Sequence, residues 1–232
     1  MPEPLPILKP IATQIAMPHP VLRVRDLSFA HPGQPALLRG WSADIPTGLT
    51  LIEGDVGAGK TSLLRLLAGE WVGEFGDGGE LCLCGQRFDA DPAAYRQQVC
   101  WFDPCDPADD DLTPAGWLAA FSARYPGTDA GVWQRLIVAF GLTPHLAKPL
   151  YALSTGTRRK AGLALALSAG CALTLLDEPA AGLDGPSLRF LSQALNEAAG
   201  HPDRAIVVAG SPGLEGLKPA GTIQLCSPAS GG

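Results

Sequence analysis

Positive charge is scarce in this sequence, and its scarcity excludes two classes of partner. The chain has 17 lysines and arginines against 23 aspartates and glutamates in 232 residues, so its formal net charge is -6. No basic stripe offsets this balance. A protein that binds nucleic-acid phosphates, or that lies by itself on anionic lipid, needs the opposite sign. The sequence therefore predicts that nucleic acid is not a partner.

Long apolar runs are missing as well. The longest one, Ala161 to Leu176, is interrupted by Ser168, Gly170 and Thr174. It falls short of the roughly 18–20 residues of a membrane-spanning helix. Residues 1–20 are rich in proline, and they have neither the basic start nor the apolar core of a secretory signal. We expect them to form an extended tail of a cytoplasmic protein.

Paired metal ligands are also lacking. Six cysteines are scattered along the chain, and Cys82 and Cys84 would share one face of a strand. No second pair of ligands has the spacing of a metal site. We expect these two residues to be small buried hydrophobes, in a chain suited to a reducing cytosol.

The sequence does contain a complete phosphate-binding loop, Gly-Asp-Val-Gly-Ala-Gly-Lys-Thr, preceded by a strand at Leu49 to Glu53. Its glycines let successive backbone N–H groups point at a polyphosphate. Lys60 adds a point charge. Thr61 opens a helix whose positive end faces the phosphates, and its hydroxyl can ligate Mg²⁺. The predicted nucleotide-binding residues are Gly54, Asp55, Val56, Gly57, Ala58, Gly59, Lys60, Thr61 and Ser62.

The rest of the chain has the pattern of one α/β domain over residues 21–232. Short runs between Gly and Pro residues predict antiparallel strands around the loop strand, at Val21 to Phe29, Ala43 to Ile45 and Glu80 to Cys84. A helical subdomain at about 105–167 is predicted from three helices, Ala115 to Tyr125, Val132 to Phe140 and Thr157 to Leu167. Two apolar runs predict central parallel strands joined by a helix at Pro186 to Ala199, namely Cys171 to Leu176 and Ala205 to Ala209.

An acidic pair, Asp177 and Glu178, ends the first of these central strands. Ligands of open parallel sheets gather at the carboxyl ends of the strands, so the pair should lie beside the phosphate loop. Asp177 is then a candidate Mg²⁺ ligand. Glu178 could orient or deprotonate a water aimed at the γ-phosphate. The alternative is a solvent-exposed strand end without a catalytic role.

A third motif, Leu153-Ser154-Thr155-Gly156-Thr157, lies ahead of a helix that begins with three basic residues. It resembles the signature of the ATPase subunits of ABC transporters, usually Leu-Ser-Gly-Gly-Gln. The resemblance implies that Ser154 and Gly156 cover the γ-phosphate bound by the opposite subunit. A turn of small residues at a helix N-terminus can bind an anion without side-chain charge. A simple N-cap role for Ser154 is the alternative.

Two further segments agree with this family. Ala181-Gly182-Leu183-Asp184 resembles its dimer-contact loop, and His31 falls where the family places an aromatic side chain on adenine. A surface histidine is the alternative for His31. The resemblance covers nearly all of residues 21–225. It implies a P-loop NTPase core of mostly parallel sheet with an antiparallel β subdomain and an inserted helical subdomain.

The same resemblance implies cofactors, partners and a location. It implies ATP and Mg²⁺, a homodimer or a related ATPase subunit, and a transmembrane transporter subunit on whose cytoplasmic face the chain would lie. The compact size is similar to the small haem-exporter type of cytochrome c maturation.

Four positions depart from the family pattern. Thr155 and Thr157 replace a glycine and a glutamine of the signature. Ser211 lies where a switch histidine is expected, and it can donate a hydrogen bond without supplying positive charge. Asp103 or Pro104 replaces a glutamine, and Asp103 could still ligate Mg²⁺. The acidic run that follows, 109–111, either receives the transporter's cytoplasmic helix or is a solvated loop.

We therefore expect an ATP-binding and hydrolysing subunit that powers a membrane transporter through nucleotide-driven dimerisation, with Lys60, Glu178 and Ser211 as its catalytic residues. One rival keeps the fold but makes hydrolysis slow or absent, which would leave a regulatory subunit. A second rival is a soluble P-loop kinase, which would need an arginine-bearing lid. A third, an ABC protein acting on nucleic acid, would need a basic surface.

Overall fold

A five-stranded parallel sheet forms the centre of the molecule. The computed structural model describes residues 20–30, 36–70, 79–102, 110–210 and 212–225. In this part of the chain the strand order is β6-β7-β8-β3-β9, and each neighbouring pair runs parallel. The strands are β3 (Gly48–Glu53), β6 (Val99–Phe102), β7 (Leu173–Asp177), β8 (Ala205–Ala209) and β9 (Pro219–Gln224).

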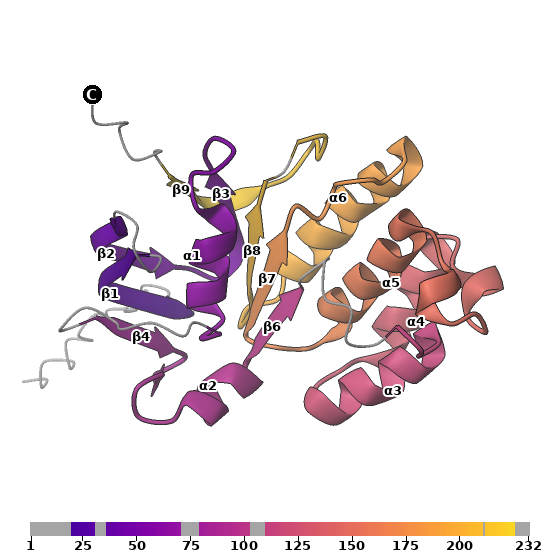
Figure 1. Cartoon of the computed structure of the whole chain (residues 1–232), viewed down its shortest axis with the longest axis horizontal. Coiled ribbons are helices and arrows are strands. Elements are labelled where there is room, and N and C mark those ends of the chain that lie inside the picture. The colour runs from indigo at the N-terminus through magenta and orange to yellow at the C-terminus, as the bar shows by residue number, and fades with distance from the viewer. Residues whose placement is uncertain (1–19, 31–35, 71–78, 103–109, 211, 226–232) are drawn as a thin grey trace, which may run out of the picture.

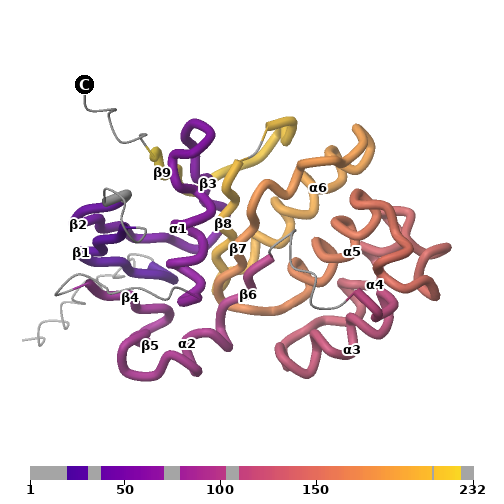
Figure 2. The backbone as a smooth tube through the Cα atoms, viewed as in Figure 1, coloured from indigo at the N-terminus to yellow at the C-terminus, as the bar shows by residue number. Residues whose placement is uncertain are grey.

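The two faces of this sheet are buried in two separate apolar clusters, because alternate side chains of a strand point to opposite faces. On β7, Leu173 and Leu175 join one cluster and Leu176 joins the other. Helix α1 (Lys60–Leu67) covers the first face, and the α3–α6 region covers the second (Figures 1 and 2). Burial on both faces explains why β7 and β8 are almost entirely apolar in sequence.

A second, antiparallel sheet lies beyond α1. Its order is β2-β1-β4-β5, with β1 (Leu22–Ala30), β2 (Ala36–Ile45), β4 (Glu80–Leu83) and β5 (Gln86–Arg87). The expectation that antiparallel strands surround the loop strand is wrong, since β3 pairs with β8 and β9 in the parallel sheet. β3 contributes Ile52 to one apolar cluster and Leu49 and Leu51 to the other, so it needs cover on both faces.

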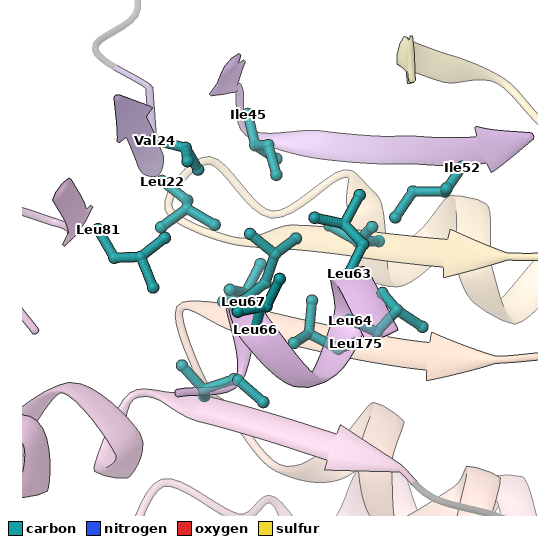
Figure 3. Close-up of a cluster of buried hydrophobic side chains, with 14 of the residues drawn as sticks. Leu22, Val24, Ile45, Ile52, Leu63, Leu64, Leu66, Leu67, Leu81 and Leu175 are labelled. Atoms are coloured by element: carbon teal, nitrogen blue, oxygen red, sulfur yellow. The ribbon is translucent and has the colours of Figure 1, made fainter. Parts of the chain in front are cut away.

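Helix α1 holds the two sheets together. Its four leucines, at 63, 64, 66 and 67, are all buried. Figure 3 shows them between Leu22, Val24 and Leu81 of the antiparallel sheet and Leu175 of the parallel sheet. Burying one leucine side chain contributes about 1.5–3 kcal/mol, so this short helix is stabilised by packing rather than by its own helix propensity.

The predicted helices are present with small shifts in their ends. They are α3 (Pro114–Arg124), α4 (Ala130–Ala139), α5 (Thr155–Ser168) and α6 (Gly185–Ala199), and two 3-10 turns, η1 (Thr143–His145) and η2 (Leu150–Ala152), connect α4 to α5. Each of the four helices starts one or two residues before the predicted position. The reason is N-capping by a side-chain oxygen, from Thr113, Asp129, Ser154 and Asp184 in turn.

Several segments of the fold were not predicted, and one of them, α2, closes the end of α1. Helix α2 (Pro92–Gln97) places the Tyr95 side chain in the core, where its hydroxyl donates to the Leu67 carbonyl at 2.7 Å. Arg96 donates to the Gly69 carbonyl at 2.8 Å. The last carbonyls of a helix lack intrahelical partners, so these two side chains satisfy part of that need. The strands β5, β6 and β9 were not predicted either.

The cysteine prediction is partly wrong. Cys84 is exposed and lies after β4 with a φ of 48°, while Cys82 is half-buried. Among the described residues no three or more histidine, cysteine or carboxylate side chains come together as a group that could hold a metal ion. None of the described helices combines the length and the apolarity that crossing a membrane would require.

The hydroxyl of Tyr95 provides a test of this packing. Tyr95→Phe should lower the free energy of unfolding by about 0.5–1.5 kcal/mol, because it removes a buried hydrogen bond to the Leu67 carbonyl. Urea denaturation measures the change. Tyr151→Phe is the matched control, since that ring is 67% exposed. Its effect should stay below about 0.5 kcal/mol, and equal losses in the two variants would contradict the account.

Candidate functional site

The phosphate loop connects β3 to α1 at the carboxyl edge of the parallel sheet. Gly54 has a φ of 151°, and a Cβ there would lie 2.6 Å from the Leu225 carbonyl oxygen, so only glycine fits. Gly59 has a φ of 92° and is the N-cap residue of α1. Between them Asp55, Val56 and Gly57 are exposed, whereas Ala58 is buried. The loop is therefore anchored at both ends and open at its tip.

Lys60 folds back over this loop. Its Nζ donates to the carbonyl oxygens of Gly54 at 2.7 Å and Asp55 at 2.8 Å. Thr61 and Ser62 follow in the first turn of α1. The ammonium group and the N–H groups of the helix start therefore share one small region, which is the electrostatic setting that a polyphosphate requires.

The hydroxyl of Thr61 meets the acidic end of β7. Thr61 Oγ1 donates to Asp177 Oδ2 at 2.6 Å, and Asp177 is only 8% exposed. Hydroxyl and carboxylate oxygens are ligands that Mg²⁺ takes in proteins. Thr61 and Asp177 thus have side chains that fit the predicted Mg²⁺. They are 116 residues apart in the sequence, and the fold brings them together.

Glu178 follows Asp177 and faces outward from the same edge. Its side chain is exposed, and its φ of 42° lies in the left-handed region that non-glycine residues rarely adopt. The backbone N–H of Glu178 donates to the Ala209 carbonyl at 2.8 Å, so the end of β8 fixes it. A Cβ on Gly210 would lie 3.1 Å from Glu178 Cγ, which places the side chain against that residue.

The signature segment, residues 153–157, lies at the start of α5. Ser154 is the N-cap residue, and its Oγ accepts from the Thr157 backbone N–H at 3.2 Å and lies 2.8 Å from Thr157 Oγ1. Ser154 thus has the N-cap role that was the alternative to phosphate binding. Its side chain is also exposed at the helix start. A Cβ on Gly156 would lie 3.0 Å from the Gly182 carbonyl oxygen, so the signature touches the loop that follows β7.

Three basic residues in the first turns of α5 each have an acceptor. Arg158 pairs with Asp110, Arg159 Nη1 donates to the Glu178 carbonyl at 2.5 Å, and Lys160 Nζ bonds Asp184 Oδ2 at 2.7 Å. Hydrogen bonds from Lys160 and Ser187 hold the pKa of the Asp184 carboxyl well below its usual range.

The sequence places these three basic residues at a helix start, but their acceptors were not predicted. Positive charge at a helix N-terminus opposes the helix dipole, and that conflict was the available signal for strong acceptors nearby.

Three predicted site residues, His31, Asp103 and Ser211, lie outside the described residues, as does Asp109 of the acidic run. The structure brings the others into two groups. The phosphate loop, Thr61, Asp177 and Glu178 form one group at the edge of the sheet. Ser154 and Gly156 form the other, which contacts the Gly182 loop.

Comparison with known proteins agrees with this geometry. The family model described as "ABC transporter" matches residues 38–181. A protein of Cupriavidus necator named "Cytochrome c biogenesis ATP-binding export protein CcmA" is 34% identical over 195 residues, which cover 83% of this chain and 84% of that protein. A protein of the same name from Rhodospirillum rubrum is 35% identical, with 72% of each chain covered.

A solved structure titled "Structure of ATP binding subunit of ABC transporter" has the same fold. Its TM-score is 0.72 at 23% sequence identity, with 83% of this chain and 80% of that chain covered. The motif order, the arrangement of the phosphate loop beside the acidic strand end, and the family match lead to one conclusion. The chain belongs to the ABC transporter family, as an ATP-binding subunit.

Proposed function

We propose that this chain hydrolyses ATP at its phosphate loop and thereby powers a membrane transporter through nucleotide-driven dimerisation. The observation that carries the proposal is the contact of Thr61 Oγ1 with Asp177 Oδ2 at 2.6 Å. It joins the first turn of α1, which also carries Lys60, to the acidic end of β7, where Glu178 follows Asp177. Such an arrangement suits a Mg²⁺-bound triphosphate.

Each residue of the first group has a separate role in this proposal. The backbone N–H groups of residues 57 and 59–61 and the ammonium of Lys60 would hold the phosphates. Thr61 and Asp177 would hold Mg²⁺, which neutralises charge on the phosphate oxygens when bound. Glu178 would accept a proton from water as the water oxygen attacks the γ-phosphorus and ADP leaves.

The second group would complete the site of a second copy. Ser154 lies exposed at the N-terminus of α5. In a head-to-tail dimer each of the two sites takes the phosphate loop from one chain and Ser154 and Gly156 from the other. ATP then joins the chains, and its hydrolysis releases them.

The proposed partner is a transmembrane transporter subunit, with this chain on its cytoplasmic face. Relatives named as export proteins support an outward direction of transport, and their names point to cytochrome c biogenesis as the process. The regulatory alternative, with slow or no hydrolysis, differs from this proposal in turnover alone, so a single substitution at Glu178 separates the two.

Glu178→Gln should reduce kcat for ATP hydrolysis by about 100-fold or more and leave KM for ATP nearly unchanged, because the amide cannot accept the proton. Phosphate release from the purified chain with ATP and Mg²⁺, alone and with membranes, is the measurement. Glu197→Gln, on an exposed position near the end of α6, is the control with the same loss of charge. Equal turnover in the wild type and in Glu178→Gln would contradict the hydrolase proposal.

A mixing experiment tests the shared site. Lys60→Met should disable the phosphate loop, and Ser154→Asp should repel the partner's phosphate while still capping α5, since aspartate is as good an N-cap as serine. Each variant alone should be nearly inactive. In an equal mixture half of the dimers are mixed, and each mixed dimer keeps one intact site. Turnover should therefore recover to about a quarter of wild type. No recovery would contradict the head-to-tail arrangement.

A further inference from the structure

We propose that Arg159 is a positioning residue for the carboxylate of Glu178, acting through the Glu178 backbone. The inference rests on the proposed role of Glu178 in hydrolysis. Arg159 lies on α5, 19 residues before Glu178 in the chain, and its Nη1 donates to the Glu178 carbonyl oxygen at 2.5 Å. Arg159 does not need to touch water or nucleotide for this role.

The first argument is the position of Arg159 on α5. Residues in the first two turns of a helix face its positive dipole end, so a cation there is unfavourable unless an acceptor compensates. Arg158 and Lys160 have aspartate side chains as acceptors, Asp110 and Asp184. Arg159 instead has the main-chain oxygen of Glu178. The contact of Arg159 therefore holds the backbone of Glu178, whereas Arg158 and Lys160 pair with charged side chains.

The second argument is the conformation of that backbone. Glu178 has a φ of 42°, which costs a non-glycine residue free energy and persists only where surrounding contacts hold it. Three contacts do so. The N–H of Glu178 donates to Ala209 at 2.8 Å, and the carbonyl accepts from Ala181 N–H at 3.1 Å and from Arg159. Arg159 is the only side chain among these three partners.

The third argument links the backbone to the carboxylate. The direction of the Cα–Cβ bond of Glu178 follows from its backbone angles, and Cγ already lies near Gly210, where an added Cβ would come within 3.1 Å. If φ relaxed to a commoner value, the side chain would rotate away from this position. A general base needs hydrogen-bond reach to its water, so a displacement of about 1 Å lowers the rate strongly.

The test compares Arg159→Met with Arg158→Met in the full chain, with ATP and Mg²⁺. Both variants remove one positive charge from the same turn of α5, but only the first removes the contact with Glu178. We expect Arg159→Met to lower kcat about tenfold with KM for ATP within about twofold of wild type. Arg158→Met should keep kcat within about twofold. Similar losses in the two variants would overturn the proposal.

Two further variants separate positioning from a general loss of structure. Rates are normalised to the fraction of chains that bind a fluorescent ATP analogue, so unfolded protein does not count. Arg159→Lys keeps a donor and should recover at least about half of the wild-type kcat. In single-turnover hydrolysis, Arg159→Met added to Glu178→Gln should change the residual rate by less than about twofold, because the amide is not a base. An undiminished tenfold loss there would overturn the proposal.

The outcomes distinguish this inference from the proposed function. If Glu178→Gln keeps wild-type turnover, the role of Glu178 itself is wrong and the proposed function fails. If Glu178→Gln is inactive while Arg159→Met keeps wild-type kcat, the proposed function stands and only the positioning role is overturned.

Discussion

The pairing of β8 with both β3 and β7 is the constraint on which the site depends. Ala209 is in register with Ile52 on one side and with Asp177 on the other, so the phosphate loop and the acidic pair leave the sheet at the same level. Two strand spacings, about 10 Å, separate β3 from β7. The loop and the first turn of α1 span that gap and let Thr61 reach Asp177. The end of β8 also holds Glu178 through the Ala209 carbonyl.

Much of this arrangement could be predicted because each motif has a local physical cause. The phosphate loop needs glycines between a strand and a helix, and Asp177 follows an apolar run that only a central strand explains. The rule that ligands gather at carboxyl ends of parallel strands then joins the two. The full length of β2 and the edge strand β9 could not be read in the same way, because edge strands have no strong apolar pattern and depend on partners distant in sequence.

Contacts between side chain and backbone were the least predictable part of the site. Tyr95 reaches the end of α1, and Arg159 reaches the carbonyl of Glu178, from segments that no spacing rule places there. Asp91 followed by Pro92 does mark a helix start, so α2 had a usable signal in its cap. The carbonyl that accepts from Tyr95 had no such signal, because every residue has a backbone carbonyl. The contact of Tyr95 joins α2 to the end of α1, and the contact of Arg159 joins α5 to the residue after β7.

The place of β3 in the sheet also bears on when the site forms during folding. Among the described residues β3 pairs with β8 and β9 alone, and those strands lie more than 150 residues later in the chain. Closing so long a loop costs entropy before any pairing energy is gained, which slows such steps. During synthesis, residues 48–61 leave the ribosome long before residues 205–224 are available to pair with them. Nucleotide binding is therefore a property that the chain acquires at the end of its folding, although the motif responsible comes early in its sequence.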